Sequence, residues 1–217
     1  MSKIWLTVHG VGSPPMDSVS DVDPKMWMAA KDFERLLDFM RKETSLTFDD
    51  GFASCWDIAF PALVRRNRTA KFFVLVGLLG KQGYLSKEQL QEMRSAGMEV
   101  GTHGMYHRRW LRLDAATLDE EIFRAKEQLE DILGEEVKEA ACPFGSYDRA
   151  SLRALRYANI RRVYTSDAIP ANTDDWLIPR YTIRASHTPD DIERIVSGRE
   201  TWKTWLQRGK ILLKQWR

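Results

Sequence analysis

Short apolar runs alternate with amphipathic stretches along most of the chain. Apolar runs rich in β-branched and aromatic residues are typical of buried strands, whereas apolar positions three and four residues apart are typical of helices that pack by one face. The runs predict strands at 4–8, 45–48, 71–76, 98–102, 137–142, 161–166 and 180–184. The amphipathic stretches predict helices at about 32–41, 54–66, 86–96, 116–133, 148–157 and 190–196.

Local signals support several of these boundaries. Ser86 with Gln89 three residues later predicts a capping box, and Gly97 and Gly134 predict left-handed helix ends. Pro61 should kink or end the second helix. Repeated strand–helix–strand units require parallel strands with right-handed crossovers. We therefore expect a single α/β domain, a distorted (β/α)7 barrel over residues 1–197, with loops at 13–30 and 167–179.

Composition and charge exclude several classes of protein. The chain has 217 residues, 43% hydrophobic and 29% charged, as in an ordinary soluble domain, and its net charge of +2 gives no reason to expect nucleic acid as a partner. Two cysteines cannot form a disulfide framework and fit a reducing compartment. The start MSKIWLTVHGVGSPP lacks the pattern of a secretory signal, and no apolar run approaches the roughly 20 residues of a membrane span. These features predict a cytoplasmic protein.

Candidate chemistry lies where the predicted strands end, which is the rim on which barrel enzymes build their sites. Asp49 and Asp50, in TFDDG, follow the second strand, although Asp-Gly is also a common turn. His103 and His107, in GTHGMYHRR, follow the fourth strand, and a helical turn would bring both imidazoles to one metal ion. A surface or structural role is the alternative. One Asp with two His forms an open metal site suited to hydrolysis, and the second carboxylate could act as a general base.

Two further strand ends carry candidates. His9 ends the first strand in LTVHGVG; a lone histidine is commonly structural, but hydrolysis of an amide needs an acid for the leaving amine. ACPFGSYD, at 141–148, follows the fifth strand, and Pro143 and Gly145 predict a tight loop whose N–H groups could face an oxyanion. An ordinary strand-to-helix turn capped by Asp148 is the alternative. Trp176, beside two carboxylates, could line a sugar subsite or belong to the core.

These motifs together resemble the polysaccharide deacetylase family, also called the NodB-homology domain or carbohydrate esterase family 4. TFDDG resembles its first motif, HGMYH its second and CPFG part of its third. The resemblance implies a metal-dependent hydrolase that removes an N-acetyl, or sometimes O-acetyl, group from a sugar. It implies Asp49 as base and Asp50, His103 and His107 as metal ligands. Zinc is the expected ion, with cobalt and nickel as alternatives.

The chain departs from the family pattern at two places. The arginine that usually opens the third motif and holds the catalytic aspartate is replaced by Ala141, and the usual late histidine is not evident. Both departures resemble a subgroup with permuted motifs and an early histidine, which implies His9 as the acid. Arg180, in LIPRY, is a candidate to orient Asp49 because it opens the last predicted strand.

Four residues are expected at the substrate. The Phe144 N–H should hold the oxyanion, and the other expected substrate contacts are Gly145, Tyr147 and Trp176. Two alternative functions stay open, a metal-dependent hydrolase of a non-sugar amide and a non-catalytic saccharide-binding module. The sequence leaves the sugar, the acyl group and the oligomeric state undetermined.

The C-terminal stretch TWKTWLQRGKILLKQWR places three tryptophans and five cations at helical spacing, which predicts a basic amphipathic helix at 198–217. Such a helix suits a membrane interface, so 199–217 could make a peripheral contact at the inner membrane face and bring the enzyme to a lipid-linked saccharide. The alternative is that its apolar side packs on the barrel.

Overall fold

The computed structural model describes residues 2–14, 23–41, 43–172 and 174–197, together with Ile211 and Lys214. Its strands are β1 (Ser2–Val8), β2 (Gly10–Val11), β3 (Trp27–Met28), β4 (Thr44–Phe48), β5 (Lys71–Val74), β6 (Glu99–Thr102), β7 (Glu139–Ala141), β8 (Arg162–Thr165), β9 (Ala171–Asn172), β10 (Leu177–Pro179) and β11 (Tyr181–Thr182). Its α-helices are α1 (Ala30–Phe39), α2 (Phe60–Arg65), α3 (Lys87–Ser95), α4 (Ala115–Leu118), α5 (Ala125–Leu133), α6 (Arg149–Tyr157) and α7 (Pro189–Val196). Most predicted elements are present with boundaries shifted by a few residues.

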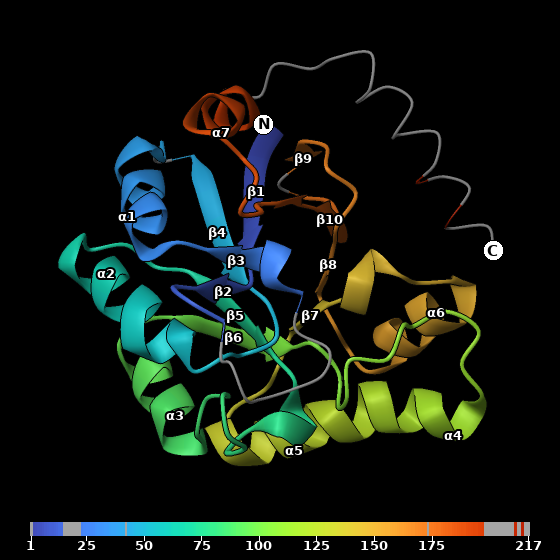
Figure 1. The fold of residues 1–217 in the computed structure, drawn as a ribbon. Helices are drawn as coiled ribbons and strands as arrows, with labels where there is room; N and C mark the ends of the chain where they lie inside the picture. Colours follow the sequence, from blue (N-terminus) through green and yellow to red (C-terminus); the bar gives the residue numbers. More distant parts are fainter. Residues whose placement is uncertain are drawn as a thin grey trace.

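The strands form a nearly closed parallel barrel with helices around its outside (Figure 1). Within the described residues the main sheet runs β10-β8-β7-β6-β5-β4-β1-β11, and β9 adds an antiparallel pairing to β1. β10 pairs with β8 at one edge of the sheet, while β11 pairs with β1 at the other. Only Arg180 separates β10 from β11 in the chain, so this short segment bridges the two edges. The predicted fold class, a single α/β barrel domain, is confirmed.

The structure differs from the predicted elements in several places. The last predicted strand, 180–184, is present only as the two-residue β11, which pairs with β1, and a separate strand, β10, precedes it and pairs with β8 at the opposite edge of the sheet. The predicted loop at 13–30 contains β3, which pairs with β2, and the loop at 167–179 contains β9 and β10. Before Pro61 the helix is widened into a π-helical turn, Cys55–Ala59, and Pro61 then lies in the first turn of α2, where its missing N–H is tolerated.

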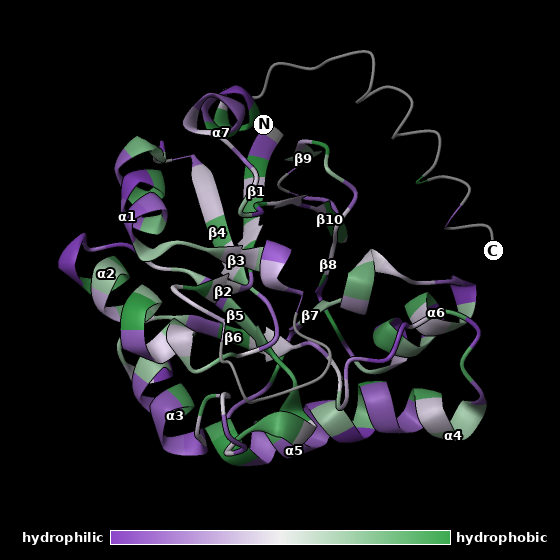
Figure 2. Ribbon diagram, in the orientation of Figure 1, coloured by the Kyte–Doolittle hydropathy of each residue, from purple (hydrophilic) through white to green (hydrophobic). Residues whose placement is uncertain are grey.

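The core lies between the sheet and the surrounding helices. Phe48 of β4 stacks on Phe72 of β5 with ring centroids 4.7 Å apart, and Phe33 of α1 packs edge-on against Phe48 at 5.8 Å. Figure 2 shows mostly hydrophobic or neutral residues on the central strands, whereas the surrounding helices carry hydrophilic residues as well. This packing holds the carboxyl ends of the parallel strands together at one rim.

The predicted C-terminal helix at 198–217 lies outside the described residues apart from Ile211 and Lys214. Among the helices that the structure describes, none has the length and apolar character that crossing a bilayer requires.

Candidate active site

The candidate residues at the ends of β1, β4 and β6 meet in one cavity of about 380 Å³ at the carboxyl rim of the barrel. The lining includes all five residues predicted for catalysis and metal binding, and also Phe144: His9, Asp49, Asp50, His103, His107 and Phe144. The sequence pattern therefore located the rim residues that share this cavity.

Asp49 is held by a bidentate ion pair with Arg180. Each carboxylate oxygen accepts from a different guanidinium nitrogen at 2.7 Å, and Arg180 also donates to the Thr47 hydroxyl and to the Thr165 carbonyl. Arg180 is fully buried. Burial by itself would raise the pKa of Asp49, but the Arg180 guanidinium outweighs it and lowers the pKa to about 2. Asp49 is therefore ionised and fixed in orientation.

Ala141, at the position where the family usually has its arginine, packs in the barrel interior beside Phe73 and Tyr164. The guanidinium of Arg180 lies 5.4 Å from the Phe73 ring centroid and 5.7 Å from that of Tyr164. An arginine from the β10–β11 segment thus reaches Asp49 in a chain that has alanine at 141.

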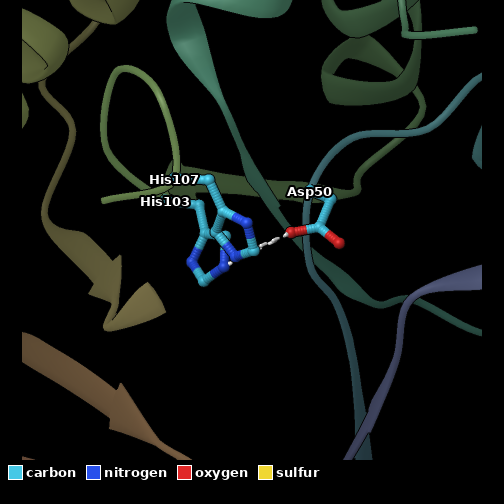
Figure 3. Close-up of side chains that lie close together, drawn as sticks. All are labelled: Asp50, His103 and His107. Atoms are coloured by element: carbon cyan, nitrogen blue, oxygen red, sulfur yellow. Dashed lines mark ion pairs between the residues drawn. The ribbon is translucent and has the colours of Figure 1, made fainter. Parts of the chain in front are cut away.

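Asp50, His103 and His107 converge on one point (Figure 3). Asp50 Oδ1 lies 3.5 Å from Nε2 of each histidine, and one ligand atom from each of the three residues lies within 4.8 Å of the others. Asp50 Oδ1 is buried and has no hydrogen-bond partner among the described groups. Burial and then the Asp49 charge raise the pKa of Asp50 to about 8. A buried carboxylate oxygen without a donor, faced by two imidazoles, fits a divalent cation.

The histidines present the neutral form that a metal requires. His103 is buried, and its Nδ1 lies 2.9 Å from the Ala141 carbonyl oxygen, which can only accept; Nδ1 therefore carries the proton and Nε2 has a free lone pair. Burial lowers the pKa of His103, and burial together with His103 lowers the pKa of His107 to about 3. Both rings can therefore bind a cation without first losing a proton.

Three residues of this site have an unusual backbone conformation. Asp50, His107 and Phe144 have φ values of 72°, 62° and 57°, in the left-handed region that side chains other than glycine seldom adopt. Strained residues persist only where surrounding contacts hold them, and they gather at functional sites. The predicted helical turn across His103 and His107 is wrong, because residues 103–107 form an irregular loop after β6 and His107 approaches Asp50 through its strained backbone.

His9 lies in the same cavity directly after β1. Its Nδ1 is buried and lacks a hydrogen-bond partner in the part of the chain that the structure describes. Burial lowers the pKa of His9 to about 4, although the Asp49 charge opposes this shift. The imidazole is therefore mainly neutral and has an unsatisfied nitrogen.

Of the four residues predicted at the substrate, only Phe144 lines the cavity that holds the Asp-His-His cluster. The Phe144 ring stacks on His107 with centroids 4.2 Å apart and is 52% exposed, whereas Gly145, with φ of 60°, is buried behind it. Tyr147 and Trp176 line a separate cavity of about 470 Å³. Tyr147 donates its hydroxyl proton to Asp167 at 3.2 Å, and the Trp176 indole N–H bonds to a backbone carbonyl. The structure does not bring these two side chains to the Asp-His-His cluster.

Several lining residues were missed by the sequence reasoning. Asp23 enters the cavity from the predicted loop at 13–30, and Arg109 and Arg184 come from segments in which no role was predicted for these residues. The Arg109 guanidinium lies 4.1 Å from the Phe144 ring centroid. Proximity to HGMYH was the available signal for Arg109, and the end of the last predicted strand at 184 was the signal for Arg184, whereas none existed for Asp23.

A parallel barrel with one carboxylate and two imidazoles converging at its rim has the donor set that metal-assisted hydrolases use. The family model described as polysaccharide deacetylase matches residues 38–163, more than half of the chain. The chain belongs to the polysaccharide deacetylase family. The matched segment includes the Asp-His-His cluster and Asp49, and it leaves out His9 and Arg180.

The chain is also similar to curated proteins and to solved structures. A poly-β-1,6-N-acetyl-D-glucosamine N-deacetylase of Staphylococcus aureus (strain MRSA252) is 23% identical over 161 residues, 67% of this chain and 56% of that protein. The chain spans about half the length of the curated relatives it matches. The Streptococcus pyogenes deacetylase PplD in complex with acetate superposes with a TM-score of 0.79 at 19% identity, over 90% of this chain and 98% of that one. IcaB from Ammonifex degensii gives a TM-score of 0.73 at 21% identity, over 90% and 96%. At these identities the two structures establish likeness of fold.

Proposed function

We propose that this protein is a metal-dependent hydrolase that removes an acetyl group, in the first place an N-acetyl group, from a sugar of a polysaccharide, oligosaccharide or lipid-linked saccharide. One observation carries the proposal: an oriented, ionised Asp49 shares a cavity with the Asp50, His103 and His107 cluster. The staphylococcal relative, named for N-deacetylation of a polymer of N-acetylglucosamine, supports the same substrate class.

Asp50, His103 and His107 would hold the ion, for which we propose zinc. When bound, such an ion polarises a carbonyl group and lowers the pKa of water, so that attack on an amide becomes feasible at neutral pH. Because Arg180 engages both oxygens of Asp49, the carboxylate has a fixed direction in the cavity. We assign Asp49 the role of accepting a proton from the attacking water.

The oxyanion and the leaving amine need their own partners. Gly145 N–H already bonds to the Cys142 carbonyl, whereas no described acceptor takes the Phe144 N–H, which we therefore assign to the oxyanion. His9 is mainly neutral before reaction, so the proton that it delivers to the amine must be acquired during turnover. We propose that the proton removed from water reaches the amine by way of Asp49 and His9, which balances water and amide against acetic acid and amine, equivalent to acetate and protonated amine.

The test combines zinc content with acetate release from β-1,6- and β-1,4-linked N-acetylglucosamine oligomers. Wild-type protein, Asp49→Asn and His103→Ala/His107→Ala are compared. We expect about one zinc per chain in the wild type and in Asp49→Asn, little in the double variant, and activity only in the wild type, since loss of a general base costs about 10²–10⁴ in rate.

Three outcomes would contradict the proposal. Turnover by Asp49→Asn at the wild-type rate would exclude Asp49 as the base. Failure of the wild type to take up metal after incubation with zinc would favour a saccharide-binding module that has no chemistry. Acetate release from simple amides, but from neither oligomer, would point to a non-sugar substrate.

A further inference from the structure

A buried carboxylate outside the cavity holds the loop that carries the two histidines. Glu121 is fully buried, and its Oε1 accepts the Tyr106 N–H at 2.9 Å while Oε2 accepts the Met105 N–H at 3.2 Å. Within the described residues Glu121 has no ion pair with a lysine or arginine. Burying an unpaired carboxylate is costly and raises the pKa of Glu121, and these two charge-assisted hydrogen bonds, together with the Trp110 indole, oppose that effect.

The same loop is held from its other side by the segment after β5. The Val76 N–H bonds to the Gly104 carbonyl and the Gly77 N–H to the Met105 carbonyl, each at 3.0 Å. Residues 103–107 are neither helix nor strand, yet donors and acceptors of the intervening peptides are engaged by fixed partners. The residues of η3 (Val76–Leu78) donate hydrogen bonds to the carbonyl groups of the loop, whereas Glu121 accepts hydrogen bonds from the N–H groups of the loop.

The contact between Glu121 and the loop leaves no room for a larger residue at Gly104. A Cβ there would lie 2.4 Å from Glu121 Oε2, and Gly104 has a φ of 90°. The loop thus approaches the carboxylate as closely as glycine permits, which is expected where a conformation is fixed by a specific contact.

Helix geometry explains how an acidic residue enters the interior. Glu121 lies in a π-helical turn, Asp119–Arg124, inserted between α4 and α5. A π turn shifts the phase of a helix, and here the neighbours Glu121 and Ile122 are both buried. The preceding Glu120 is instead partly exposed and forms an ion pair with Arg108 at 2.9 Å. π turns occur frequently at functional sites.

We propose that Glu121 is a positioning residue for the metal site: by fixing the Met105 and Tyr106 peptides it holds His103 and His107 in the arrangement that converges on Asp50 before an ion arrives. This inference rests on the metal site of the proposed function. Mutation of groups that hold metal ligands in position without touching the metal commonly weakens metal binding by about 10–100-fold.

The test measures the zinc dissociation constant by competition with a chromophoric chelator, in Glu121→Gln and in the matched control Glu120→Gln. Glutamine keeps the size of the side chain, but it places an amide NH₂ against one backbone N–H. We expect Glu121→Gln to raise Kd for zinc about 10–100-fold. We expect Glu120→Gln to stay within about twofold, because its carboxylate is partly exposed and bonds to the Arg108 side chain, not to the Met105 or Tyr106 peptide.

A second control separates positioning from general stability. Leu155→Ala removes a side chain from the core cluster that contains Ile122, and it should lower the melting temperature with an unchanged zinc Kd. Amide hydrogen exchange of residues 103–107 in metal-free protein gives a readout that needs no metal. It should accelerate in Glu121→Gln and not in Leu155→Ala. If Glu121→Gln does not fold, Glu121→Asp, which is too short to reach both N–H groups, takes its place.

The outcomes distinguish this inference from the proposed function. Wild-type zinc affinity in the Glu121 variant, or unchanged exchange of the loop, would overturn the positioning role and leave the metal site standing. Absence of zinc binding by the wild type would overturn both. Weaker zinc binding in the Glu121 variant with faster exchange, while both controls bind normally, would support the inference.

Discussion

Replacement of Arg180 by methionine should cost much more stability than an ordinary substitution in the barrel wall. Arg180 is fully buried and makes four side-chain hydrogen bonds: two to Asp49 at 2.7 Å, one to Thr47 at 2.9 Å and one to the Thr165 carbonyl at 3.2 Å. Arg180→Met removes all four and leaves the Asp49 carboxylate buried without a cation.

The expected magnitude follows from these contacts. Removing one partner of a buried ion pair destabilises a protein by about 3–5 kcal/mol, because the other charge stays buried without compensation. Asp49→Asn alone should cost less, about 1–3 kcal/mol, since an amide oxygen still accepts from Arg180. The double variant Arg180→Met/Asp49→Asn has no unpaired carboxylate. Its loss of stability should therefore be smaller than the sum of the two single losses by about 2 kcal/mol or more.

The pH dependence has a definite sign. The lowered pKa of Asp49 contributes stability that is present above the unfolded value of about 3.8 and is lost as pH falls toward 2. In Arg180→Met burial acts unopposed and raises the pKa of Asp49, so ionising this group destabilises the variant. The difference in stability between wild type and Arg180→Met should therefore be larger at pH 7 than at pH 4.

The assay is urea unfolding of metal-free protein, followed by the fluorescence of the eight tryptophans and by circular dichroism at both pH values. The denaturant dependence should be unchanged among the variants, so that midpoints report stability. A wild-type midpoint for Arg180→Met at pH 7, or strictly additive losses in the double variant, would refute the buried ion pair as the element that holds Asp49.

Three further outcomes are expected. Because burial and the Asp49 charge raise the pKa of Asp50 to about 8, the metal-free protein loses stability as pH rises from about 4 to 8. Metal-free Asp50→Asn should therefore be about 2 kcal/mol more stable than wild type at pH 8 in thermal or urea unfolding, with no such gain at pH 4. Equal gains in stability at both pH values would contradict this reasoning. Phe144→Ala exposes the His107 ring and should speed zinc loss to excess chelator by about tenfold in stopped-flow measurements, an order of magnitude taken from the effect of groups around metal ligands. Trp176→Ala should lower stability by about 2 kcal/mol and leave kcat/KM for acetate release within about twofold, because the indole lines the neighbouring cavity. A large loss of kcat/KM would instead indicate that Trp176 contacts the substrate.

Local signals in the sequence were sufficient for the helices and for many of their ends. Ser86 and Gln89 form the predicted capping box, and Gly134 ends α5 with a φ of 68°. Such features depend on residues a few positions apart, whose geometry the helix itself determines. The predicted helical turn at His103 was wrong because the conformation of that loop depends on a residue of another element, Glu121, which accepts hydrogen bonds from the loop. Nothing in the sequence indicated this contact, since LDEEIF has the acidic composition of an exposed helix face.

The sequence by itself determined that the chain is a parallel α/β barrel and that His9, Asp49, Asp50, His103 and His107 share its rim. This follows because parallel strands joined by crossovers all end on the same side, so residues that directly follow them must gather there. The sequence named Arg180 only as a candidate to orient Asp49, and the tertiary structure decided that it reaches Asp49, 131 positions away, and that Tyr147 and Trp176 face a different cavity. Those pairings depend on how the sheet closes, with β10 and β11 on opposite edges and Arg180 between them. Closure is a property of all strands together, and no local stretch of sequence encodes it.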